Sequence, residues 1–378
     1  MVAALRLRVT LLGVAALLVG CTPAALLTTP GGTNPEPAAP SAATATPGVL
    51  PTASPEPTER IEMTGAWIVY QSFNQVTGLR LRLVRPDGTG AHPVFQVHAG
   101  NETHPDWSPD GARIAYVVDD KAIWIVDADG SNAARLPVPC GASCVLNDLP
   151  AWSPDGGTIA FTRLVDPPDA DPYTDVAAID LATGKIRTLY TPPAGEGTFY
   201  VRWSPDGRSI VVDINRYPSI ESDVVNAGTI GIVDVTKSNP VARTLTDWTM
   251  FATYPDWSPD GSRIVFCTND LGVRDYGNQQ DPHLASDLYT IRPDGTDLIR
   301  LTTNATGSTL VRNGTASGPL ACQPSWTPDG TAVLFTHVDG PTWPGYEIWS
   351  MNADGSSAHS QFTPAIVGTH PRLRPAQT

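Results

Sequence analysis

A five-residue phrase that returns along the chain constrains its fold more than any other feature of the sequence. Trp-Ser-Pro-Asp-Gly stands at residues 107–111, 152–156, 203–207 and 257–261, and again with Thr for Ser at 326–330. Repetition of this kind marks folds that stack copies of one small unit. The length of 378 residues therefore does not by itself imply several unrelated domains.

Each copy has the chemistry of a tight hairpin turn followed by a buried strand. Ser can bond the backbone ahead of it, Pro fixes φ, and Gly can take the left-handed conformation at the exit. Short apolar runs follow the turns at residues 114–117, 159–161, 210–212, 264–266 and 333–335. Apolar runs of this length between turns indicate strands that neighbouring units cover on both faces.

Counting strands predicts six units. Third strands stand at residues 81–84, 123–126, 176–179, 229–233, 288–291 and 348–351, and second strands number six once 67–70 is included. Only five first strands carry the Trp, but residues 369–375 align with 103–109 through a shared Thr-His-Pro start and a final Pro. We therefore expect an all-β fold, a six-bladed β-propeller of four-stranded blades. The C-terminal strand 369–375 would join the N-terminal blade and close the ring, which also protects exposed edges.

These Trp-Ser-Pro-Asp-Gly and Asp-Gly phrases resemble the repeats of the TolB-like β-propeller family over residues 61–378. The Gly-His and Trp-Asp pairs of the commoner WD-repeat propellers are missing. The resemblance implies a propeller that binds protein partners at the bacterial cell envelope. Likeness of fold alone is a weak guide to function, because one fold serves many functions.

The N-terminus resembles that of bacterial lipoproteins. Arg6 and Arg8 precede an apolar run at residues 9–19, and Leu-Val-Gly-Cys ends at Cys21. The run is short for a membrane-spanning helix. The resemblance implies that residues 1–20 are a signal peptide and that Cys21 is lipidated, so that the protein is exported and membrane-anchored, in the periplasm or on the outer cell surface. The alternative is an ordinary cleaved signal with an incidental Cys.

Residues 21–60 are rich in Pro, Ala and Thr and contain almost no large apolar side chain. Such a segment cannot bury enough surface to offset its ordering entropy, so it predicts a disordered, semi-extended tether. The propeller is expected over residues 61–378. The formal net charge of the chain is −14, which argues against nucleic acid as a partner, because that binding depends on Lys and Arg displacing counterions.

The connections between strands should lie on two different faces. The tight turns lie on one face, and the long segments lie on the other, at residues 139–148, 163–175, 190–199, 213–228, 267–286, 303–322 and 336–346. We call the second the long-loop face, and rigid scaffolds usually carry function on such loops. It is rich in acidic residues, which suits a solvated surface. A calcium cluster of Asp166, Asp169, Asp171 and Asp175 is the alternative, although its spacing matches no EF-hand loop.

The four cysteines besides Cys21 are even in number, which favours disulfides in an exported protein. Cys140 and Cys144 share one loop, where a local bridge is expected. Cys267 ends a second strand and Cys322 precedes the first strand of the next blade, so a bridge there would join adjacent blades. A zinc site from Cys140 and Cys144 is the alternative, with a spacing that fits the common zinc knuckle poorly.

Aligning the first strands picks out one position, three residues before the Trp or before Leu373. In blade order it holds His370, His104, Leu149, Tyr200, Tyr254 and Gln323. We call these the mouth residues, because they should ring the entrance of the central channel on the long-loop face. Imidazole and amide groups there could hold a divalent metal, or an anion when protonated, and the tyrosines add contact surface. The simpler interpretation is that each packs between blades.

No peptidase elbow, His-Glu-x-x-His, Walker loop or dinucleotide fingerprint stands in the sequence. The leading interpretation is a non-enzymatic envelope lipoprotein without a cofactor, which binds a protein or glycan partner through its long-loop face. The alternative is a propeller enzyme that resembles lyases of uronic-acid oligosaccharides, which hold a metal with His and Gln at the channel mouth.

Overall fold

The computed structural model of the protein describes residues 64–74, 78–94, 100–138, 143–168, 170–217, 227–269, 286–304, 320–338, 346–362 and 365–376. This part of the chain is all-β apart from one 3-10 turn, η1 (Trp248–Met250). Residues 1–63, with Cys21 and the predicted tether, lie outside the described residues. Within the ranges given above, no helix is long and apolar enough to cross a membrane.

Antiparallel four-stranded sheets are the building unit. Sheet A has the order β25 (Thr369–Leu373), β1 (Ile68–Asn74), β2 (Gly78–Val84) and β3 (His92–Pro93). Sheet B has the order β4 (Glu102–Trp107), β5 (Arg113–Val118), β6 (Ala122–Asp127) and β7 (Ala134–Arg135). Sheet C has the order β8 (Cys144–Trp152), β9 (Thr158–Val165), β10 (Tyr173–Asp180) and β11 (Ile186–Tyr190).

The remaining strands form two larger sheets. In sheet D, β12 (Glu196–Gly197) and β13 (Val201–Trp203) both pair with β14 (Ser209–Arg216), which is followed by β15 (Ala227–Asp234) and β16 (Ala242–Thr244). Sheet E contains β17 (Thr253–Trp257), β18 (Ile264–Asn269), β19 (Ser286–Ile291), β20 (Ile299–Arg300), β21 (Leu320–Trp326), β22 (Ala332–Val338), β23 (Glu347–Asn352) and β24 (His359–Ser360). Its two halves meet through one parallel pair, Ser286 with Leu320. The described strands therefore form five sheets, and not the six separate blades expected, because this contact merges two four-stranded halves.

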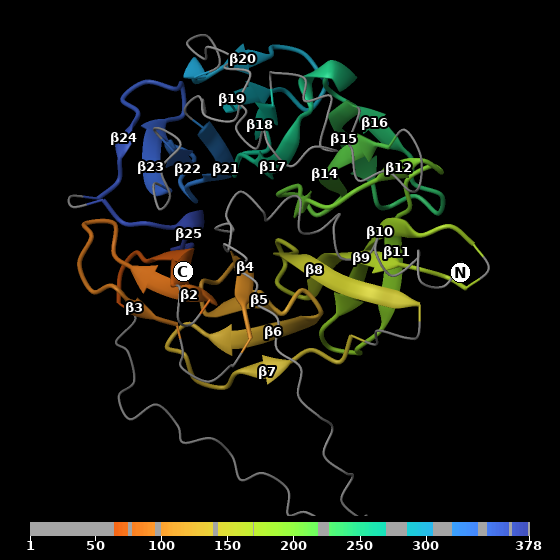
Figure 1. Ribbon diagram of the computed structural model, residues 1–378, viewed down its shortest axis with the longest axis horizontal. Coiled ribbons are helices and arrows are strands. Elements are labelled where there is room, and N and C mark those ends of the chain that lie inside the picture. The colour runs from red at the N-terminus through yellow and green to blue at the C-terminus, as the bar shows by residue number, and fades with distance from the viewer. Residues whose placement is uncertain are drawn as a thin grey trace, which may run out of the picture.

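The sheets stand around a common centre as the blades of a β-propeller (Figure 1). Strands β4, β8, β17, β21 and β25 lie nearest the centre, and the short strands β3, β7, β16, β20 and β24 lie at the rim. The C-terminal strand β25 pairs antiparallel with β1, with Leu373 opposite Ile68, as the sequence predicted for residues 369–375 and 67–70. The first and last described strands thus share one sheet.

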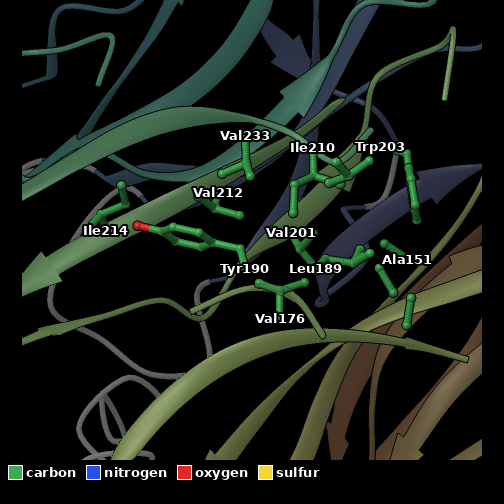
Figure 2. Close-up of a cluster of buried hydrophobic side chains, with 13 residues drawn as sticks. Ala151, Val176, Leu189, Tyr190, Val201, Trp203, Ile210, Val212, Ile214 and Val233 are labelled. Carbon is green, nitrogen blue, oxygen red and sulfur yellow. The ribbon is translucent and has the colours of Figure 1, made fainter. Parts of the chain in front are cut away.

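The apolar core is divided among the interfaces between sheets. Figure 2 shows the cluster between sheets C and D, where Val176 and Leu189 of sheet C face Val201 and Val212 of sheet D. These four side chains are at most 1% exposed. Fully burying one such side chain is worth about 1.5–3 kcal/mol. Because each sheet is covered by its neighbours, the apolar runs predicted from the sequence form strands buried on both faces.

The repeated turn explains the tight connections. In one copy the Ser153 hydroxyl donates to Asp155 at 2.5 Å, and the Gly157 N–H donates to the same carboxylate oxygen at 3.0 Å. Gly156 takes a φ of +69°, which glycine adopts without strain. A Cβ at Gly156 would meet Pro109 of the preceding turn at 3.8 Å, so consecutive turns pack against each other.

Several strands run further into the predicted long segments than expected. Strand β8 begins at Cys144 within 139–148, and β14 continues to Arg216 within 213–228. The expectation rested on apolar runs, and it stopped at the first polar residue. Buried polar side chains continue these strands because they find partners across the sheet interface, as where Thr162 donates to the carbonyl of Phe199.

Candidate functional site

The six mouth residues meet at one small cavity where the innermost strands converge. Each side chain comes from the beginning of a first strand, or from just before it, and the strands belong to all five sheets. The cavity has a volume of about 20 Å³, and its wall includes His104, Leu149, Tyr200, Tyr254, Gln323 and His370. Alignment on the Trp therefore identified residues that the fold brings together.

The backbone at these positions departs from regular strand geometry. φ is positive at five non-glycine mouth residues that each precede a proline: His104, Leu149, Tyr254, Gln323 and His370. Tyr200 precedes Val201 instead, and it is not among the positive-φ residues. The strand register shifts at such a position, for example between Thr103 and Asp106, as in a β-bulge. A non-glycine residue held at positive φ costs about 1–3 kcal/mol, and such strain concentrates at functional sites.

Aromatic rings fill most of the mouth. The rings of Tyr200 and Tyr254 lie 3.8 Å apart between centroids. His370 lies 5.8 Å from Tyr254 and makes an edge contact with His104 at 4.9 Å. The mouth residues therefore pack against one another, as the simpler interpretation of the sequence held, and they also line the cavity.

A carboxylate orients His104. Its Nδ1 lies 2.8 Å from Oδ1 of Asp148, and the two residues are 7% and 4% exposed. Asp148 also accepts the backbone N–H of Leu149 at 2.7 Å. Nearby, burial raises the pKa of Asp120, and the negative charge of Asp148 raises it further. The aspartate fixes which way the imidazole of His104 faces, a common arrangement for histidines that act on a ligand.

Asp213 is a second buried carboxylate beneath the mouth. Its Oδ1 accepts the backbone N–H groups of Phe199 at 2.8 Å and Tyr200 at 2.9 Å, and its Oδ2 accepts the Thr253 hydroxyl at 3.0 Å. Burial raises the pKa of Asp213, and these hydrogen bonds oppose that effect. The carboxylate therefore joins β14 to the start of two first strands, which is a structural task.

Two arginines and two aspartates form a charged layer next to the mouth residues. Arg372 Nη1 lies 3.2 Å from Asp256 Oδ2, and Arg372 Nε lies 3.9 Å from Asp106 Oδ1. Arg202 Nε lies 3.7 Å from Asp256 Oδ1. Burial lowers the pKa of Arg202, and the charge of Arg372 lowers it further. Both carboxylates also accept a backbone N–H from a repeat Trp of the next unit, at 2.9 Å.

The mouth residues do not fit the metal site that the sequence suggested. Oε1 of Gln323, the atom that would bind a metal, accepts the Thr336 hydroxyl at 2.8 Å and the backbone N–H of His370 at 3.3 Å. His104 already uses Nδ1 on Asp148. Across the part of the chain that the structure describes, no group of three or more His, Cys, Asp or Glu side chains is placed to hold a metal ion.

The other predicted sites fall in three places. Cys267 and Cys322 are bonded, with Cα atoms 5.1 Å apart, and they join the two halves of sheet E. Cys144 is also disulfide-bonded, but Cys140 lies outside the described residues. Of the predicted calcium ligands, Asp169 also lies outside them. Asp175 is instead held by the guanidinium of Arg163 through bonds of 2.8 and 2.5 Å.

Sequence reasoning missed the charged layer and the two buried aspartates. Arg202 and Arg372 occupy the position two residues after the mouth position, directly before the Trp or Leu373. The same alignment would have found them, because residues two apart on a strand lie on one face. Asp148 and Asp213 carry no comparable signal, since their partners lie on other strands.

No protein-family model matches the sequence. The chain is 26% identical over 234 residues to the uncharacterized protein Atu1656 of Agrobacterium fabrum, which covers 60% of this chain and 67% of that protein. It is also 26% identical over 187 residues to the uncharacterized peptidase YuxL of Bacillus subtilis. That match covers 48% of this chain but only 24% of the peptidase.

Two solved structures resemble the fold more completely. TolB from Acinetobacter baumannii has a TM-score of 0.55 and 19% identity, over 82% of this chain and 67% of that chain. A protein from Agrobacterium tumefaciens described as a TolB has a TM-score of 0.56 and 19% identity, over 82% of this chain and 97% of that chain. At this level of identity the likeness concerns the fold. The chain therefore has a TolB-like β-propeller fold built from four-stranded blades.

Proposed function

We propose that this protein is a non-enzymatic lipoprotein of the cell envelope whose propeller binds a protein partner through its long-loop face. The observation that carries the proposal is the filled mouth, where side chains with catalytic chemistry pack together or bond within the fold. A cavity of about 20 Å³ holds little more than one water molecule, which leaves no room for a substrate. Recognition then falls to the surface around the mouth.

Exposed apolar side chains on the long-loop face support a protein partner. Phe73 is 42% exposed and Val367 is 40% exposed. Gln71 pairs with Thr369 between β1 and β25, so the two apolar residues lie near each other beyond that pair. Tyr173 is 39% exposed at the start of β10, also at this face. Aromatic side chains are enriched in protein interfaces, and exposed apolar groups of this kind mark contact sites.

Site-specific photo-crosslinking in the parent cells tests the proposal. A photoreactive residue is placed at Phe73, and as a matched control at Val241, which is 79% exposed in the connection between β15 and β16 on the opposite face. We expect a discrete protein adduct from position 73 that is missing from position 241. Adducts of equal pattern at both positions, or glycan adducts alone, would reject the protein partner.

A closed ring of six blades is the arrangement that we infer for the propeller. The two halves of sheet E each repeat the four-strand order of the other sheets, which supports counting them as two blades. Pairing of β25 with β1 supports closure by residues 369–375. So does Gly111 of the first repeated turn, where a Cβ would meet the carbonyl of Pro375 at 2.7 Å.

Membrane attachment through Cys21 is part of the proposal, and it rests on the lipobox in the sequence. Two or three acyl chains give stable anchoring, whereas one does not. Cys21→Ala should move the protein from the membrane fraction to the soluble fraction. A variant that still sediments with salt-washed membranes would show that another attachment operates.

The second candidate is a propeller enzyme of the oligosaccharide-lyase kind, and the meeting of His104 and His370 at the cavity favours it. Under this candidate, the mouth side chains would have to rearrange to free Gln323 and admit substrate. Manganese-dependent cleavage of uronic-acid oligosaccharides by the purified protein would support it, provided that His370→Gln abolishes the activity.

A further inference from the structure

Two buried nitrogens in the wall of the mouth cavity have no hydrogen-bond partner: Nε of Arg202 and Nε2 of His370. The nearest carboxylate to Arg202 Nε is Asp256 at 3.7 Å, which is too far for a hydrogen bond. Leaving a buried donor unpaired costs about 1–3 kcal/mol, and more for a charged group. A ligand that accepts hydrogen bonds would remove this cost.

The atoms around the cavity are mainly donors. The Thr369 hydroxyl lies 3.2 Å from Nδ1 of His370 and can donate to it, which leaves the ring proton of the neutral imidazole on Nε2. Gln323 uses its oxygen on Thr336 and on the backbone N–H of His370, so its amide nitrogen is the group left for the cavity side and Tyr254. The available acceptors, Asp106 and Asp256, already bind backbone N–H groups and arginines.

The electric field at the cavity decides the sign of the ligand. Burial lowers the pKa of His370 well below its usual value, and the neighbouring charges of His104, Arg372 and Arg202 lower it further. Groups that disfavour a positive charge on the imidazole also repel a metal cation, and they attract an anion. A cavity of about 20 Å³ admits one particle of about the size of a water molecule.

We propose that the mouth cavity is a binding site for a single monatomic anion of halide size, held by Nε–H of Arg202 and Nε2–H of His370. The anion completes the hydrogen bonds of both donors and offsets the two arginines of the charged layer. The site is independent of the identity of the protein partner. By joining side chains from sheets A and D, the bound anion would also stabilise the ring from its centre.

Bromide is the probe, because its anomalous scattering separates it from water. Crystals of the full chain grown in sodium bromide should show one anomalous peak within hydrogen-bond distance of both nitrogens. Water alone in the cavity at molar bromide would overturn the proposal, as would manganese density there after a manganese soak. This arm needs no variant, so it decides the question even where substitutions unfold the protein.

Chloride binding in solution gives the second readout, through line broadening of the chloride-35 resonance. Arg202→Lys keeps the charge but removes Nε–H, and His370→Gln keeps a polar side chain. Either variant should weaken binding about tenfold or more, as expected when a hydrogen bond to a charged group is lost. Arg208→Lys is the matched control, because Arg208 is exposed on a tight turn, and it should bind like the parent. Unchanged broadening in both test variants would overturn the assignment.

Discussion

At the scale of single residues, Glu102 shows how a propeller buries a charge between sheets. It lies at the start of β4 with 1% exposure, and its Oε2 accepts the backbone N–H of Leu81 in sheet A at 3.1 Å. Burial raises the pKa of Glu102 to about 7, while the bond from Leu81 and the charge of Arg80 oppose the rise. The folded state therefore holds a proton that the unfolded chain releases near pH 4.5.

This difference predicts that stability falls as the pH rises. A carboxyl with a higher pKa in the folded state contributes stability fully below its unfolded pKa, and it loses that contribution as the pH passes the folded value. Glu102→Gln keeps an oxygen for Leu81 and carries no charge, so at pH 8 it should be more stable than the parent by about 2 kcal/mol. Urea unfolding at pH 5 and pH 8 measures the effect. Exposed Asp171→Asn is the control, and equal slopes for Glu102→Gln and the parent would refute the assignment.

The mouth residues show what sequence reasoning can and cannot reach at this scale. The Trp register fixed which six side chains meet, because each first strand enters the centre in the same way. It did not reveal the positive φ of His104 or its bond to Asp148, since both depend on contacts between strands of different sheets. Expecting an open entrance was the corresponding error, because side-chain volume fills the space that strand positions leave.

At the scale of elements, the repeated turn was predictable because its chemistry is local. Ser, Asp and Gly close the turn within five residues, and the same bonds recur in each copy. The carboxylates accept bonds from the Ser or Thr two residues before and from the backbone N–H two residues after, and these bonds lower the pKa of Asp110, Asp155, Asp206, Asp260 and Asp329. Strand ends were less predictable, because pairing with a neighbour can extend a strand past its apolar run.

Removing one such carboxylate should have a small effect that depends on pH. Asp155→Ala deletes the bonds from Ser153 and Gly157, and we expect a loss of about 1 kcal/mol at pH 7. A depressed pKa gives stability that is present above the unfolded value of 3.8 and disappears as the pH falls through the folded value. The difference between Asp155→Ala and the parent should therefore shrink towards pH 3. Denaturant midpoints at both pH values test this, and a difference that grows in acid would contradict it.

At the scale of the whole molecule, the C-terminal strand joins parts of the chain that are far apart in sequence. The backbone N–H of Arg374 donates to the carbonyl of Trp67 in the N-terminal segment at 2.7 Å. Its Nε donates to the carbonyl of Gly111 at 2.7 Å, and its guanidinium lies 5.6 Å from the ring centroid of Trp107. One arginine therefore contacts both neighbouring sheets. The sequence predicted this pairing from the Thr-His-Pro match, although Arg374 stands where the repeat has Ser.

Deleting residues 366–378 should destabilise the whole ring and not just one edge. The truncated chain loses the partner of β1, the acceptor that Trp107 finds in the carbonyl of Arg372 at 3.1 Å, and both contacts of Arg374. It also loses His370 and Arg372 from the cavity and the charged layer. We expect a loss of about 3 kcal/mol or more, together with a broader thermal transition, because sheets on either side of the gap become exposed edges. Calorimetry of the deletion against a control that lacks only residues 377–378 makes the comparison. If both chains melt alike, the propeller does not depend on its C-terminal strand, and the six-bladed closed ring is wrong.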